Sequence, residues 1–100
     1  MLVLSRARGE SIVLGGARIV VQRMNPRIRL AYLSSGSVRD YEFDRKQVDH
    51  LPVLNLDDQI EVTLLRISPD DKLVFGIRAP RDVLIMRGEL SPEQTKKYFR

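Results

Sequence analysis

The chain has 100 residues, of which 43% are hydrophobic and 30% charged, and its formal net charge is +4. This composition is that of one folded domain with a small core, and it excludes a chain that is disordered throughout. The absence of cysteine excludes disulfides and thiolate metal sites, and we expect a cytoplasmic protein because we find neither an apolar run long enough for a membrane span nor a signal-peptide pattern.

Short apolar runs separated by turn-forming residues predict β-strands along most of the chain. The predicted strands cover residues 2–4, 11–14, 18–23, 27–32, 41–43, 60–64, 73–75 and 83–86. Met24-Asn25-Pro26 and Ser68-Pro69-Asp70-Asp71 are typical of hairpin turns, and residues 34–37 are typical of a loop. The Ser-Pro pair that opens residues 91–100 suits the start of a helix. The sequence therefore predicts an all-β protein of short antiparallel strands with a short C-terminal helix.

The positive charge consists mainly of arginine, with thirteen arginines and four lysines. Residues 1–29 hold six of the arginines and one acidic residue, Glu10, whereas residues 51–100 hold eight basic and eight acidic residues. The planar guanidinium group binds phosphates and guanine edges in a bidentate manner and stacks on bases. This distribution is consistent with nucleic-acid binding, and it is equally that of a solvated basic face.

Two segments at opposite ends of the chain have a distinctive pattern. Residues 1–10 are Met-Leu-Val-Leu-Ser-Arg-Ala-Arg-Gly-Glu, and residues 75–87 are Phe-Gly-Ile-Arg-Ala-Pro-Arg-Asp-Val-Leu-Ile-Met-Arg. Together they resemble the opening strand and the closing Gly-x-x-Ala-Pro-x-x-Val-x-Val-x-Arg segment of the carbon storage regulator (CsrA/RsmA) family of bacterial RNA-binding translational regulators. Many more residues separate the two segments here than in the family.

The resemblance implies a small CsrA-like β-barrel or sandwich that controls translation by recognising GGA-containing hairpin loops in mRNA leaders. In the family, each RNA site combines the first strand of one subunit with the last strand of the other in an intertwined dimer. The RNA-binding residues that this implies here are Leu4, Ser5, Arg6, Arg8, Ala79, Pro80, Arg81, Ile85, Met86 and Arg87. Arg87 is the implied main contact, and the apolar members of the set are also typical core residues. The implied partner is mRNA or a small regulatory RNA, with no cofactor and no metal.

The chain departs from the family pattern at two positions. Ala7 stands where the family usually has a second arginine, and Arg8 follows one residue later. Because side chains alternate across a strand, we expect Arg8 to share the face of Arg6. At the polar position within the Gly-x-x-Ala-Pro loop, this chain has the more basic residue Arg78. The first departure favours weaker RNA binding, and the second favours stronger phosphate contact.

The two halves of the chain also resemble each other weakly. The hairpin pattern of residues 18–32 recurs in residues 59–77, and each is followed by a segment that contains an arginine near its end. We expect a single domain of 100 residues in which residues 1–50 and 51–90 are pseudo-repeats that form a fused pseudo-dimer. The alternative is a single family unit into which residues 17–56 are inserted.

A fused pseudo-dimer would assemble its RNA site within one chain. Residues 2–6 would lie beside residues 83–88 and complete one site. The opposite site would need an opening strand near residue 50, and the acidic residues of segment 41–44 would stand where phosphate approaches. We therefore expect one RNA site per chain. Without the duplication, a homodimer with two distant sites is the alternative.

Enzymatic activity is not expected from this sequence. His50 is the only histidine, and its neighbour Asp49 makes at most a surface pair before a proline. The acidic pairs at residues 57–58 and 70–71 fall in predicted turns and lack the ligand spacing of a calcium loop. Gly15-Gly16 is not followed by the helix that a phosphate-binding loop requires.

A second function class remains open at this point. The chain could be a protein-interaction module that binds or antagonises a CsrA-type regulator without itself reading RNA, by forming a mixed dimer or by adding a strand to a sheet. The missing second arginine and the acidic segment favour this alternative. The basic N-terminal third and Arg87 favour RNA.

Overall fold

In the computed structural model, residues 1–50, 52–57 and 59–88 are described. The elements in these ranges are β1 (Leu2–Arg6), β2 (Ser11–Leu14), β3 (Ala17–Arg23), β4 (Arg27–Ser34), β5 (Ser37–Asp44), the 3₁₀ helix η1 (Arg45–His50), β6 (Val53–Asp57), β7 (Ile60–Ile67), β8 (Leu73–Arg78) and β9 (Ile85–Gly88). The all-β prediction is confirmed. The predicted C-terminal helix, residues 91–100, lies outside the described residues.

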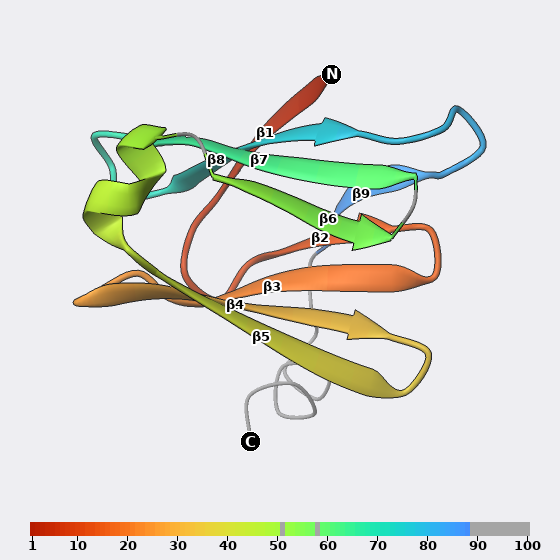
Figure 1. Cartoon of the computed structure of the whole chain (residues 1–100), viewed down its shortest axis with the longest axis horizontal. Helices are drawn as coiled ribbons and strands as arrows, with labels where there is room; N and C mark the ends of the chain where they lie inside the picture. The colour runs from red at the N-terminus through yellow and green to blue at the C-terminus, as the bar shows by residue number, and fades with distance from the viewer. Residues whose placement is uncertain (51, 58, 89–100) are drawn as a thin grey trace.

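The strands form two antiparallel sheets that exchange strands between the two halves of the chain. One sheet has the order β1-β8-β7-β6 and the other has the order β5-β4-β3-β2-β9 (Figure 1). Strand β1 therefore completes the sheet of the second half by pairing with β8, and β9 completes the sheet of the first half by pairing with β2. Each half contributes its own three-stranded meander, β2-β3-β4 or β6-β7-β8.

The hydrophobic core lies between the two sheets and draws on both. Alternate residues of the central strands face inward, as the period of a half-buried strand requires. The largest fully buried side chains of the core include Phe75, Leu64 and Leu73 from one sheet and Ile12, Ile19, Ile28 and Leu30 from the other. Because both halves supply this one core, neither half has a separate core among the residues that the structure describes.

Strand β5 is longer than predicted and forms a hairpin with β4. It pairs with β4 over its whole length, from Ser34↔Ser37 to Arg27↔Asp44. The predicted loop at residues 34–37 is wrong, because Ser35 and Gly36 alone form the turn, with φ of 50° and 78°. Positive φ at both central positions is the geometry of a tight two-residue hairpin.

The chain differs from prediction at two further places. The last strand runs from residue 85 to 88 and not from 83 to 86, because the Val83 N–H bonds to the Pro80 carbonyl at 3.0 Å and holds residues 80–83 in a turn. Residues 45–50, where no element was predicted, form η1 between β5 and β6 (Figure 1). Val48 of η1 is 1% exposed and belongs to the core.

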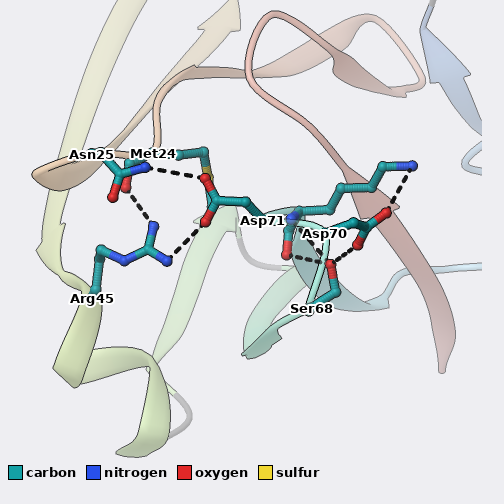
Figure 2. Close-up of polar contacts among 7 residues, drawn as sticks. Met24, Asn25, Arg45, Ser68, Asp70 and Asp71 are labelled. Carbon is teal, nitrogen blue, oxygen red and sulfur yellow. Dashed lines mark hydrogen bonds and ion pairs between the residues drawn. The ribbon is translucent and has the colours of Figure 1, made fainter.

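A polar cluster connects the β3–β4 turn, η1 and the β7–β8 turn (Figure 2). The Arg45 guanidinium donates to the Met24 carbonyl at 2.7 Å and to Asp71 Oδ1 at 2.8 Å. Asn25 Nδ2 donates to the other Asp71 oxygen at 3.1 Å. Asp71 has a φ of 61°, a left-handed conformation that aspartate tolerates better than most residues. The cluster ties the two halves together at one end of the sandwich.

Candidate nucleic-acid interface

The two segments singled out by the sequence are both edge strands, and they lie on the same side of the sandwich. Strand β1 is the edge of one sheet and β9 is the edge of the other. At the opposite edges, η1 packs against both β5 and β7, which places the β5 edge over the β6–β7 edge. The remaining edges, β1 and β9, therefore lie on the other side, where the short connections of residues 7–10 and 79–84 cross between the sheets. We call these the β1–β9 side and the β5–β6 side.

Strand register shows which side chains point into the β1–β9 side. Leu4 is paired with Phe75, and Arg87 is paired with Ile12. Because Phe75 and Ile12 are core residues, Leu4 and Arg87 are on the inner faces of their sheets. Ile85, opposite Leu14, is on the same inner face. Leu4 and Ile85 are partly buried against the core, whereas Arg87 is exposed.

The two arginines of the first segment have different environments. Arg6 is 6% exposed and forms an ion pair with Glu10, with 3.0 Å between Nη2 and Oε2. The other Glu10 oxygen accepts the Ala7 N–H at 2.6 Å. Arg8 is exposed in the turn after β1. The expectation that Arg6 and Arg8 share one strand face is wrong, because β1 ends at Arg6 and the alternation ends with it.

The connection between β8 and β9 holds the remaining predicted residues. Ala79 and Pro80 are partly buried, and Arg81 is exposed. The Gly15 N–H donates to the Leu84 carbonyl at 2.7 Å, which anchors the end of this connection to the β2–β3 turn. Leu84 itself is 61% exposed and was not predicted as a site residue. The sequence contains a signal for this exposed residue. All four residues of segment 83–86 are apolar, and a strand that buries alternate side chains leaves two of them exposed.

Exposed cations lie at both ends of the β1–β9 side. Arg8 and Arg87 are near the end where β1 leads into β2, and Arg78 and Arg81 are at the end where β8 leads into β9. None of these four forms an ion pair within the described residues. The apolar Leu4 and Ile85 lie between the two ends. The arrangement offers an apolar centre flanked by positive charge.

Ser5 and Met86 complete the predicted set, and they lie on the outer faces. Ser5 is paired with Val74 and Met86 with Val13, both of which alternate with core residues. Met86 is 47% exposed and Ser5 is partly buried. The structure thus distributes the ten predicted residues over both edge strands and both connections of one side.

A cleft of about 470 Å³ lies elsewhere, on the outer face of the five-stranded sheet. The β2–β3 turn, the β4–β5 turn and strand residues beneath them line it, and none of the ten predicted residues does. The candidate interface, which is made of strand edges, therefore does not coincide with this cleft. Within the described residues, no group of three or more His, Asp or Glu side chains could hold a metal ion, and no helix is long and apolar enough to cross a membrane.

The model of the CsrA family, described as a global regulator protein family, matches residues 44–96, which is more than half of the chain. The chain belongs to the CsrA family. No curated protein and no solved structure matches it. Within this CsrA-family chain, the match begins at the last residue of β5 and takes in η1 and β6 to β9. It therefore covers Ala79, Pro80, Arg81 and strand β9, whereas the predicted residues of β1 lie outside it.

Proposed function

We propose that the chain is an RNA-binding translational regulator that recognises GGA-containing hairpin loops in mRNA leaders through its β1–β9 side. The observation that carries this proposal is the position of Arg87. It is an exposed arginine on an edge strand within the matched family region, and it is on the inner face of its sheet, opposite the core residue Ile12. Family membership supplies the regulatory class, and this geometry supports RNA as the ligand.

The chemistry of the β1–β9 side suits a hairpin loop. Bases that are splayed out of a loop present free edges and faces to a protein. An edge strand has backbone N–H and C=O groups that no neighbouring strand uses, and these can pair with base edges. Leu4 and Ile85 supply apolar contact for a base face. Arg87 can bind a guanine edge in a bidentate manner, and a pair of this kind contributes about 1–3 kcal/mol of discrimination.

The other cations have a supporting role in the proposal. Arg8, Arg78 and Arg81 are exposed and can attract the RNA backbone, because phosphate contacts position a nucleic acid without reading its sequence. Arg6 is buried and paired with Glu10, so we assign it a positioning role in which it fixes the turn that presents Arg8. Position 7, where the family usually has an arginine, is alanine here. In the proposal, Arg78 and Arg81 supply the phosphate attraction that this arginine would have given.

A titration of a fluorescent RNA hairpin with a GGA loop tests the proposed function. We expect submicromolar binding that weakens with salt, a loss of about tenfold or more in Arg87→Ala, and weak binding of a scrambled loop. The matched control is Arg66→Ala, which removes an exposed arginine from β7, a strand inside its sheet. Binding that is indifferent to the loop, or equal losses in the two variants, would contradict the proposal and favour the protein-interaction alternative.

A further inference from the structure

The last strand of each half pairs with a different kind of partner. In the second half, β9 leaves its own meander and pairs with β2, the first meander strand of the other half. If β5 followed the same rule, it would pair with β6, the first meander strand of the second half. It pairs instead with β4 of its own half. Likewise β1 pairs with β8 of the other half, whereas residues 45–50, directly before the second half, form η1 and do not pair with β4. The two sides of the sandwich are therefore built differently.

One end of the β5–β6 side is covered by η1 (Figure 1). Val48 of η1 is 1% exposed and packs in the core between the sheets, and Arg45 at the start of η1 is held by Asp71. On the β1–β9 side no helix among the described residues fills the gap, and Leu4, Val83 and Ile85 are only partly buried there. Tyr41 and Phe43 of β5 are partly buried as well, so the difference between the two sides is the buried helical residue Val48, which is present on the β5–β6 side alone among the described residues.

The charges on the two sides also differ. The outward carboxylates of β5 are paired with arginines of β4: Arg27 lies 2.9 Å from both Glu42 and Asp44, and Arg29 lies 3.0 Å from Asp40. These arginines are therefore already neutralised, and the edge strand itself carries acidic side chains. The β5 edge has one further exposed arginine, Arg39, which donates to the Tyr41 hydroxyl at 3.2 Å. Among the described residues, a phosphate backbone therefore finds four cations without an ion pair on the β1–β9 side, and one such cation beside three carboxylates on the β5 edge.

We propose that this chain acts as a monomer with a single RNA site, and that it cannot bridge two recognition motifs in one RNA. The inference rests on the proposed function. Both strands that cross between halves are already paired within the chain, so neither is available for exchange with a second copy. A protein with one site gains nothing from a tandem target, because avidity requires two sites that can be engaged at the same time.

Native mass spectrometry and titration with one-motif and two-motif RNAs test this inference. We expect a free chain at the monomer mass of 11.5 kDa. The one-motif RNA should take one chain, and the two-motif RNA should take two chains, each with the affinity measured for the single motif. A dimer mass, two RNAs per chain, or one chain bound at least tenfold more tightly to the two-motif RNA would overturn the inference. A lack of any loop-specific binding would instead overturn the proposed function itself, and the inference with it.

Site-specific crosslinking gives a matched second measurement. Met86 on β9 and Val38 on β5 are both exposed apolar residues on edge strands, at 47% and 63% exposure. A photo-crosslinking residue placed at Met86 should capture the one-motif RNA, whereas the same residue placed at Val38 should capture at least tenfold less. Equal capture at the two positions would show that the β5–β6 side also binds RNA and would overturn the single site.

Discussion

Ser11 on β2 and Gly88 on β9 stand opposite each other in the strand register, and the Ser11 hydroxyl donates to the Gly88 carbonyl at 3.1 Å. Ser11 is completely buried, and its hydroxyl also accepts a hydrogen bond from Arg18 Nη1 at 2.9 Å. A buried polar atom with two partners is costly to disturb. This contact fastens the strand that carries Arg87 to the first half of the chain.

Replacing Gly88 should loosen that strand. A Cβ at this position would overlap the Ser11 hydroxyl and lie 2.7 Å from Arg18 Nη1 and 3.1 Å from Val13 Cγ2. We expect Gly88→Ala to lower the free energy of unfolding by about 1–3 kcal/mol, as overpacking does, and to weaken RNA binding. Chemical denaturation and the hairpin titration measure the two effects. Gly16→Ala is the control, because nothing lies within 4 Å of its Cβ position; equal costs for the two variants would contradict the proposed clash.

Removing the charge of Glu10 should destabilise the protein. Glu10→Gln leaves the buried Arg6 guanidinium without its counter-ion, and we expect a loss of about 1–2 kcal/mol in the free energy of unfolding, since Glu10 is itself partly exposed. The double variant Arg6→Met with Glu10→Gln should recover much of the loss, because it no longer buries an unpaired charge. Urea denaturation of the single and double variants tests this, and a double variant less stable than Glu10→Gln would refute it.

Two substitutions of Asp71 should differ in cost. Asp71→Ala removes the bonds to Arg45 and Asn25 and places alanine at a φ of 61°, so we expect a loss of about 1–3 kcal/mol in the free energy of unfolding. Asp71→Asn keeps a side chain that tolerates the left-handed conformation, and it loses mainly an exposed ion pair worth about 1 kcal/mol or less. Thermal or chemical denaturation distinguishes them. If Asn costs as much as Ala, the ion pair and not the backbone conformation is the important term.

Asp70 should give stability a specific dependence on acid pH. A hydrogen bond from the Ser68 hydroxyl, with smaller contributions from the Asp70 backbone and Lys72, lowers the pKa of the Asp70 carboxyl below the ordinary aspartate value of 3.8. Because the pKa in the folded state is lower than in the unfolded state, the stabilisation is complete above the unfolded pKa and is lost as the pH falls through the folded pKa. The stability difference between wild type and Asp70→Asn should therefore shrink below about pH 4.

Carboxyl-carbon NMR titration measures the same group directly. In Ser68→Ala the pKa of Asp70 should rise toward the value of an unperturbed aspartate, because the hydroxyl that favours its charged form is absent. An unchanged Asp70 titration in this variant would show that Lys72 or the backbone, and not Ser68, is the main cause.

Local patterns predicted most of the strands. The apolar alternation of β3, β4 and β7 and the turn residues between β7 and β8 were sufficient for those hairpins, because they depend on contacts close in sequence. The partner of β5 was harder to predict, although the Ser35-Gly36 pair that fixes its register is visible in the sequence. The shift of the last strand to residues 85–88 depends on a bond from Val83 to Pro80 that no period reveals.

The residues of the candidate site could be selected from the sequence, but their burial and their ion pairs could not. Arg87 and Ile85 could be selected from the closing segment, and register then placed them on an inner face. The burial of Arg6 depends on where β1 ends and on Glu10 four residues later, whereas the family resemblance implied an RNA contact at this position. The burial of Val48 on the β5–β6 side was not predicted, because a single apolar residue among polar neighbours gives no periodic signal.

Because the two halves are covalently linked, the amount of assembled β1–β9 side depends on protein concentration in a simple way. In an assembly of separate subunits, dilution below the dissociation constant disperses the strands that must meet, so the assembled fraction depends on protein level. Here β1 and β9 are brought to the same side by one polypeptide, and dilution cannot separate them. The quantity of the assembled β1–β9 side therefore rises in direct proportion to expression, with no threshold at low copy number.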